Sequence, residues 1–332
     1  MVKICFVKNR ITSAFIILFL FCIFDLFPQC NIYSDRSHIC IIGDTQHISF
    51  WESLFWDYWG ENNAEKTKIL FDEIASENPA FLIHLGDITF NGSNKNQWFK
   101  FKHDSKAIRD KQILIYPIMG NHEYFGNNEK AIQNYFNEFP YLVSKKSENG
   151  NVSRKFLWYS LIFNKVAFVM LNSNFDELSD IEADEQLKWY KYSLLNFEKN
   201  DSILSIIVCS HHPPFTNSRI VSPSEIIQSD YLPHFEKIKK ASFFFSGHCH
   251  SYEKFERKGK FFIVSGGGGG PRQKLNIDKS EREYNDKFDG PEIRPLHFCE
   301  LKIESKGINL TVIELKNNLR FSVMDTVFVR YP

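Results

Sequence analysis

The sequence lacks an excess of charge of either sign. Its 332 residues contain 40 lysines and arginines and 40 aspartates and glutamates, so the formal net charge at pH 7 is zero. Proteins that bind the nucleic acid backbone usually carry a basic field, and this chain has none, so we expect no partner of that kind. The sequence also has no internal repeat, no low-complexity tract and no Gly-x-Ser-x-Gly elbow of a serine hydrolase.

Cysteine is sparse and irregularly spaced. Of the seven cysteines, Cys40, Cys209, Cys249 and Cys299 lie in or beside apolar, strand-like segments, where free cysteine behaves as a small buried hydrophobe. The spacing matches neither a disulfide framework nor a zinc motif, and it leaves a single disulfide open. Apolar and aromatic residues are abundant by contrast, at 43% and 16%, which allows a large packed core and argues against disorder.

The first 30 residues differ from the rest of the chain. Three basic residues among the first ten precede the apolar run 11–24, which is shorter than the roughly 20 residues of a spanning helix. This pattern is typical of a secretory signal, so residues 1–30 are predicted to be a signal peptide or an N-terminal anchor. We expect an exported protein, periplasmic, secreted or on the outer surface, whose only membrane contact is this anchor or a lipid on Cys30. A single catalytic domain is predicted over residues 38–330.

From residue 38 onward, short apolar segments alternate with longer amphipathic ones. The predicted buried strands are 38–43, 80–86, 113–120, 165–171, 202–210 and 241–247. The predicted helices are 63–78, 94–110 and 180–200, where apolar residues recur at helical spacing. Such alternation predicts an α/β layered fold. The tail has strand-like segments without helices between them, at 261–266, 296–304, 307–315 and 319–329, and predicts an antiparallel section that closes the domain.

Polar residues follow five of the predicted strands. They are Asp44, Asp87, Asn121 with His122, His211, and His248 with His250. Each alone has an ordinary explanation as a turn, a cap or a surface histidine. Because binding groups in α/β sheets gather at the carboxyl ends of strands, we expect these side chains to converge. Carboxylate, amide and imidazole ligands without thiolate suit manganese, iron(II) or zinc, and a shared carboxylate makes a site for two ions.

Five short motifs carry a resemblance to a known family. They are GDTQ (43–46), GDITF (86–90), GNHE (120–123), HHPP (211–214) and GHCH (247–250). Their order and their positions after predicted strands resemble the signature of the calcineurin-like metallophosphoesterases. The resemblance implies a four-layer α/β/β/α sandwich that holds two divalent metal ions, which would be manganese, iron or zinc.

The resemblance also implies roles for residues within the motifs. The implied metal ligands are Asp44, Gln46, Asp87, Asn121, His211, His248 and His250. Asp87 would bridge the two ions, with Asp44, Gln46 and His250 on one ion and the remaining three ligands on the other. His122 would bind no metal and would face the phosphate of the substrate. His212 is expected to pack or to support a ligand.

Two positions depart from the family pattern. Gln46 stands where many members have histidine, and manganese-dependent ADP-ribose and CDP-alcohol diphosphatases are similar in having glutamine there. The motifs GNHE, GHCHSYE and DEQLKWY (184–190) resemble the purple acid phosphatase branch, which has tyrosine at the position of Phe90. Phenylalanine has no oxygen to bind iron(III), so two divalent ions and no purple colour are expected.

The predicted function is hydrolysis of a small phosphorylated substrate by a metal-activated water, as a phosphomonoesterase. A phosphodiesterase or nucleotide diphosphatase is the alternative among enzymes. A non-catalytic, metal-containing surface binding protein is the alternative of another class.

Two segments have two interpretations each. The glycine run 265–271 predicts backbone packing near the metals or a substrate contact, and the aromatic segment 50–60 predicts core packing or a wall of the substrate site.

Overall fold

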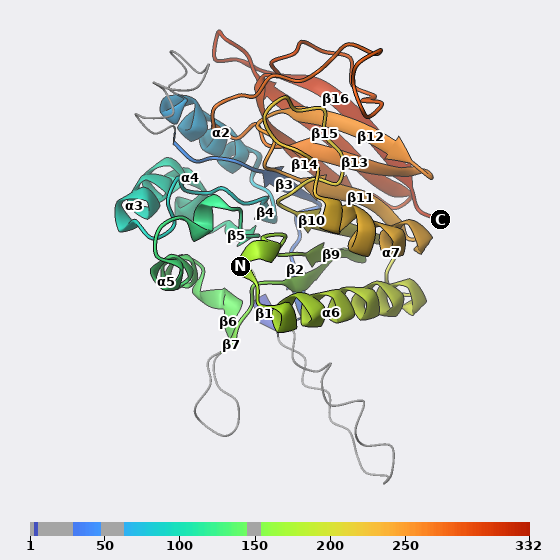
Figure 1. The fold of residues 1–332 in the computed structure, drawn as a ribbon. Coiled ribbons are helices and arrows are strands. Elements are labelled where there is room, and N and C mark those ends of the chain that lie inside the picture. Colours follow the sequence, from blue (N-terminus) through green and yellow to red (C-terminus); the bar gives the residue numbers. More distant parts are fainter. Residues whose placement is uncertain (1–2, 6–28, 48–62, 145–153) are drawn as a thin grey trace.

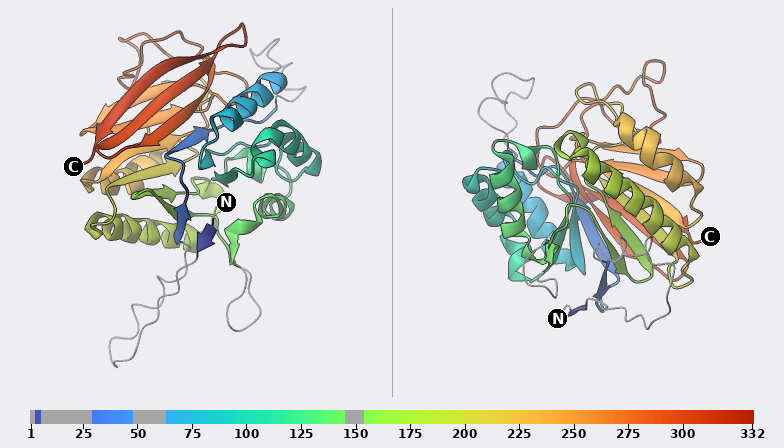
Figure 2. Two further views of the ribbon diagram at one scale, coloured as in Figure 1. Left: turned by 180° about the vertical axis from the view of Figure 1, so that it is seen from behind. Right: turned by 60° about the horizontal axis from the view of Figure 1, so that its bottom comes forward.

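The computed structural model describes residues 3–5, 29–47, 63–144 and 154–332. Two mixed β-sheets lie face to face, and helices pack on their outer surfaces (Figures 1 and 2). The predicted α/β/β/α arrangement is therefore confirmed. The aromatic segment 50–60 and residues 6–28 of the predicted signal lie outside the described residues.

The first sheet has eight strands in the order β1-β2-β8-β9-β10-β11-β13-β12. These are β1 (Lys3–Cys5), β2 (Gln29–Tyr33), β8 (Tyr159–Phe163), β9 (Val166–Met170), β10 (Ser205–Ser210), β11 (Ala241–Ser246), β12 (Tyr252–Arg257) and β13 (Lys260–Ser265). Strands β9, β10, β11 and β13 run parallel. All residues of β10 and β11 are buried, as expected for parallel strands covered on both faces. Strand β2 joins this sheet from residues that precede position 38.

The second sheet has six strands in the order β16-β15-β14-β3-β4-β5. These are β3 (His38–Ile42), β4 (Phe81–His84), β5 (Leu114–Pro117), β14 (Leu296–Ile303), β15 (Gly307–Leu315) and β16 (Phe321–Arg330). Strands β14, β15 and β16 are antiparallel, which confirms the closing section over 296–329. The inclusion of 261–266 in that section was wrong. Strand β13 belongs to the first sheet, where it pairs in parallel with β11 and antiparallel with β12, and its apolar side chains extend the buried layer of that sheet.

Helices flank the two sheets on opposite sides (Figure 1). They are α2 (Ala64–Glu77), α3 (Lys95–Asp104), α4 (Lys106–Asp110) and α5 (Asn128–Glu138) beside the second sheet, and α6 (Asp180–Lys199) and α7 (Leu232–Lys237) beside the first. Shorter elements are β6 (Val143–Ser144), β7 (Arg154–Lys155), the 3₁₀ turns η2 (His122–Tyr124), η3 (Pro140–Leu142) and η4 (Phe175–Glu177), and the π-helical turn η5 (Ile227–Tyr231). The helix predicted over 94–110 is interrupted at Ser105, whose hydroxyl donates to the Phe101 carbonyl and competes with regular helical bonding.

Two apolar cores hold the layers together. Between the sheets, the ring of Phe81 on β4 meets Phe163 and Phe168 of β8 and β9 edge to face, with centroids 5.3 and 6.0 Å apart. Between the first sheet and its helices, Phe235 of α7 meets Phe244 of β11 at 5.4 Å. Edge-to-face pairs of this kind stabilise a core beyond the apolar area that they bury. The sheets are thus fixed relative to each other, which positions the strand ends described next.

Cys40, Cys209, Cys249 and Cys299 are buried and form no disulfide, as predicted for small apolar side chains. Burial raises the pKa of the Cys40 and Cys249 thiols well above the usual value, so these groups remain protonated. Within the described ranges, no helix combines the length and the apolar composition needed to cross a bilayer.

Candidate functional site

The predicted ligands lie at the carboxyl ends of five strands that belong to both sheets. Asp44 and Gln46 follow β3, Asp87 follows β4, Asn121 follows β5, His211 follows β10, and His248 and His250 follow β11. The chain thus brings together groups as distant in sequence as Gln46 and His250, whose side chains make contact across 204 residues. Strand ends of the two facing sheets meet at one point, and the polar residues gather there.

Asp44, Gln46, Asp87 and His250 form the first half of the cluster. The Gln46 amide nitrogen donates to Asp87 Oδ2 at 3.2 Å and lies 3.0 Å from His250 Nε2, which is itself 3.4 Å from Asp44 Oδ1. The amide oxygen of Gln46 is buried and finds no hydrogen-bond partner among the described residues. Rotating the amide by half a turn would exchange its two ends and bring the oxygen to the carboxylate and the imidazole. This donor set fits a hard divalent ion.

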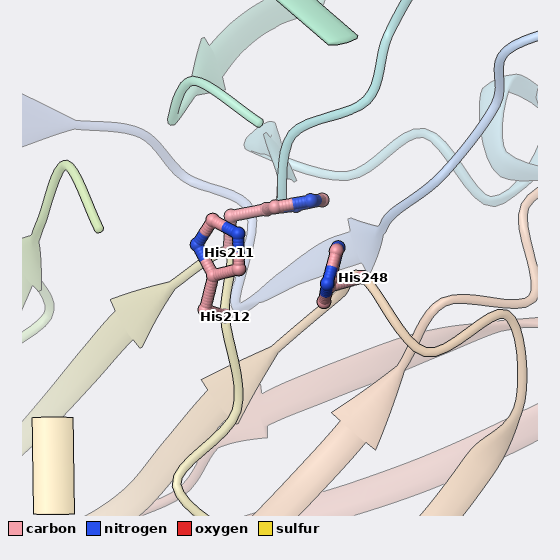
Figure 3. A group of neighbouring side chains, drawn as sticks. All are labelled: His211, His212 and His248. Carbon is pink, nitrogen blue, oxygen red and sulfur yellow. The ribbon is translucent and has the colours of Figure 1, made fainter. Parts of the chain in front are cut away.

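Asn121, His211 and His248 form the second half, and Asp87 adjoins both halves. His211 Nε2 lies 3.1 Å from Asn121 Oδ1 and 3.4 Å from Asp87 Oδ1. The other ring nitrogen of His211 donates to the Leu85 carbonyl at 2.8 Å, so Nε2 is the atom turned toward the cluster. The rings of His211 and His248 are 5.0 Å apart, and Figure 3 shows them approaching from neighbouring strand ends. Nitrogen donors dominate this half.

Charges in the cluster are strongly coupled. Burial raises the pKa of Asp44. Burial alone would also raise the pKa of Asp87, but the imidazoles of His211 and His122 hold it well below its usual range. The Asp87 charge in turn raises the pKa of His211 to about 9, against the effect of burial. The proton on His211 neutralises the buried negative charge of Asp87. A divalent cation bound in this place would neutralise that charge instead.

Three of the predicted ligands have strained backbones. Asp44, Asp87 and His248 have φ angles of 59°, 52° and 66°, in the left-handed region that non-glycine residues seldom adopt. Hydrogen bonds hold them there: the Asp44 amide donates to Gly86, and the His248 amide donates to both Asp44 oxygens at 2.9 and 3.1 Å. Strain that the surroundings maintain in this way concentrates at functional sites.

His122 lies beside Asp87 at the margin of the cluster. Its backbone amide donates to Asp87 Oδ1 at 3.0 Å, and its Nε2 is 3.8 Å from Asp87 Oδ2. Nδ1 donates to the Phe90 carbonyl at 2.8 Å, so this nitrogen carries the hydrogen and Nε2 is turned toward the cluster. The rings of Phe90 and Phe125 pack against the imidazole, at centroid distances of 5.2 and 4.4 Å. His122 is therefore held rigidly while 12% of its side chain stays exposed.

Glu123 has a role that the sequence did not reveal, although it belongs to the GNHE motif. Its buried carboxylate accepts four backbone N–H groups, from Asp87, Ile88, Thr89 and Gly120, at 2.7 to 3.1 Å. Burial and the Asp87 charge raise the pKa of Glu123 to about 8, while the N–H donors favour its ionised form. The carboxylate joins the turn after β4 to the turn after β5, and so fixes the separation of their ligands. In the sequence, its position directly after His122 was the only indication that Glu123 belongs to the site.

The glycine run packs against the first half of the cluster. The amide of Gly268 donates to the Gly43 carbonyl at 2.9 Å, and the amide of Gly270 donates to the Asp44 carbonyl at 2.8 Å. The Pro271 carbonyl accepts from His250 Nδ1 at 2.7 Å, which turns His250 Nε2 toward Asp44. The packing interpretation of 265–271 is confirmed by these contacts.

The sequence profile of the calcineurin-like phosphoesterases matches residues 37–252, which is more than half of the chain. The chain belongs to the calcineurin-like phosphoesterase family. The matched range contains all seven predicted ligands and His122. This family comprises metal-dependent phosphoesterases, whose members typically bind two metal ions, and the carboxylate and imidazole groups of this chain are consistent with such a centre. A search of curated proteins finds no match.

Solved structures with this fold include members of several kinds. GAP50, described as the anchor in the inner membrane complex of Plasmodium, has a TM-score of 0.63 at 15% identity, over 90% of this chain and 89% of its own. The purple acid phosphatase PPD1 from yellow lupin seeds has a TM-score of 0.65 at 15% identity, over 91% of this chain and 56% of its own. A dimetal phosphatase from Danio rerio has a TM-score of 0.56 at 11% identity, over 90% and 100%. At these identities the likeness is one of fold.

Proposed function

We propose that this protein is a phosphomonoesterase that requires two divalent metal ions. The observation that carries the proposal is the buried cluster around Asp87, together with the rigid, partly exposed imidazole of His122 at its margin. Asp44, Gln46 and His250 would hold one ion, Asn121, His211 and His248 the other, and Asp87 both. When bound, a pair of ions of this kind supplies Lewis-acid activation of water and neutralises phosphate charge.

His122 is proposed to act directly on the substrate. The hydrogen on Nδ1 is committed to the Phe90 carbonyl, so any proton that the ring gives or takes moves at Nε2. This nitrogen is close to Asp87 without belonging to either group of ligands. It is placed to protonate the leaving oxygen or to donate a hydrogen bond to a phosphate oxygen.

The test is to replace His122 and to measure metal content and activity separately. His122→Ala should keep the wild-type metal content and lose activity by roughly 10²–10⁴-fold, the usual contribution of a positioned acid or base. His103→Ala, which removes an exposed imidazole from α3, is the matched control and should retain full activity. A smaller loss on nitrophenyl phosphate than on alkyl phosphates would indicate protonation of the leaving group. Full activity of His122→Ala on every substrate of the wild type would refute the assignment.

The proposed substrate is a phosphate monoester. A panel of phosphomonoesters, cyclic nucleotides and nucleotide diphosphates, each with added Mn²⁺ or Zn²⁺, would distinguish it from the phosphodiesterase and diphosphatase alternatives. Preference for diphosphates would assign the chain to the kind of chemistry that the glutamine at position 46 suggested.

A second candidate function is that of a non-catalytic anchor or binding protein. The likeness to GAP50, which is described as an anchor, is the observation that raises it. Two observations argue against this function. The set of metal-ligand donors is complete, and a protein that only binds a partner has no use for His122. Absence of hydrolysis over the whole panel, with both ions bound, would favour the anchor.

Export remains a proposal that rests on the basic start and the apolar run 11–24. It predicts that the native protein lies outside the cytoplasm with its amino terminus shortened or lipid-bound. Mass spectrometry that found residues 1–30 intact on protein from a cytosolic fraction would contradict it.

A further inference from the structure

Three imidazoles gather at the ends of β10 and β11, where the family resemblance accounts for two of them. His211, His212 and His248 each offer a ring nitrogen within 4.8 Å of the others (Figure 3). We propose that His212 is a third imidazole ligand of the ion that His211 and His248 hold. The inference rests on the proposed two-metal function, and it replaces the expectation that His212 merely packs or supports a ligand.

The His212 ring is held through Nδ1, as are the rings of two predicted ligands. His211 and His250 each have Nδ1 held by a carbonyl oxygen, at 2.8 and 2.7 Å, with Nε2 turned inward. Nδ1 of His212 is 2.9 Å from the hydroxyl oxygen of Ser173, which also accepts the His212 backbone amide at 2.9 Å. In the tautomer with its hydrogen on Nδ1, His212 donates to the Ser173 hydroxyl oxygen, and its Nε2 can then offer a lone pair to a metal ion.

The ring positions favour a shared cation over simple packing. The His212 ring lies 4.4 Å from that of His248 and 5.0 Å from that of His211, at steep angles of 57° and 84°. Nε2 of His211 lies 3.4 Å from Asp87 Oδ1, so this ring faces the space beside that carboxylate. Three ring nitrogens that converge on one space can all bind a single cation placed there. A metal ligand is the use that fits three converging imidazoles.

This assignment makes the two metal positions chemically different. The position beside His212 would have three imidazoles, the Asn121 amide and Asp87, whereas the other would have one imidazole with two carboxylates and the Gln46 amide. Imidazole-rich sites suit zinc, and oxygen-rich sites suit manganese. We therefore expect the chain to take Zn²⁺ at the first position and Mn²⁺ at the second when both metals are supplied.

The first experiment measures zinc affinity by chelator competition in the full chain loaded with excess Mn²⁺. His212→Ala should lower the affinity for one equivalent of Zn²⁺ by more than the 10–100-fold that loss of an outer-shell partner costs, and Ser173→Ala should fall within that range. His103→Ala should match the wild type. A loss of 100-fold or less in His212→Ala would overturn the proposal, because a His212 that only packs or supports a ligand predicts a loss of that size.

The second experiment needs no variant and covers the case in which His212→Ala fails to fold. Zinc X-ray absorption on the wild-type chain with one equivalent of Zn²⁺ and excess Mn²⁺ counts the imidazoles on zinc. Three imidazoles are expected, and two would overturn the inference while leaving the phosphoesterase proposal intact. A chain that binds neither metal would overturn both proposals together.

Discussion

Gly270 gives the most selective test of the arrangement of the predicted metal ligands. A β-carbon at this position would lie 3.1 Å from Cε1 and Nδ1 of His250 and 3.2 Å from the Gln46 amide oxygen. The backbone of Gly270 lies outside the left-handed region, so alanine is tolerated there in conformation. The three atoms nearest to this β-carbon belong to two predicted ligands of the same ion, so Gly270→Ala would push on them by a few tenths of an ångström.

The expected size of the effect follows from that displacement. His250 is held from behind by the Pro271 carbonyl at 2.7 Å, so its ring cannot retreat without weakening this bond. Loss of such an outer contact usually costs 10–100-fold in metal affinity, or about 1.4–2.7 kcal/mol. The ion beside Asn121 and His211 should be unaffected, because the atoms nearest to the added methyl belong to the first half of the cluster. At moderate metal concentration the variant should retain one ion where the wild type retains two.

The assay is metal analysis by mass spectrometry after dialysis against a weak chelator, with thermal unfolding measured in parallel. Gly259→Ala is the stability control, because this glycine has a φ of +71° and nothing within 4 Å of the added methyl. It should lower the melting temperature and keep both ions. Gly120→Ala is the opposite control: its β-carbon would lie 2.1 Å from Asp87 Oδ1, so both ions should be lost. Equal loss of both ions in Gly270→Ala would refute the division of the cluster into two halves.

Three further predictions concern charge and colour. Asp87→Asn should lower the content of both ions, since it removes the negative charge that both share; unchanged metal content would contradict a bridging role. Burial raises the pKa of Glu253 from 4.5 to about 7, so the wild type loses up to roughly 3 kcal/mol of stability as pH rises through that interval. The melting temperature of Glu253→Gln relative to wild type should thus rise between pH 5 and pH 8, and a flat difference would contradict it. The metal-loaded protein should show no strong visible band, because Phe90 offers no phenolate; a purple preparation would reveal another oxygen donor.

Local patterns were enough to predict much of the fold. Strands β10 and β11 and helix α6 were recognisable because buried parallel strands are apolar throughout and an amphipathic helix repeats every 3.6 residues. Pairing partners were not recognisable in the same way. The segment 261–266 has the composition of any buried strand, so its composition does not show which strand it pairs with. Its place beside β11 is visible only in the folded sheet. Strand β2 was missed because its first two residues fall within the predicted signal and the other three precede the predicted domain.

The sequence by itself determined which chemical groups stand at the strand ends. Residues of a short motif such as GNHE or GHCH are neighbours in the chain, so they must lie close together in any fold. Only the tertiary structure decided how those groups face one another. The inward nitrogen of His211 is selected by the Leu85 carbonyl, which follows β4, and the His212 ring is held by Ser173, which lies in the segment after β9. Four N–H groups from two separate turns converge on Glu123. Hydrogen bonds between distant segments leave no periodic trace in a sequence, so the orientation of the site depends on the folded chain.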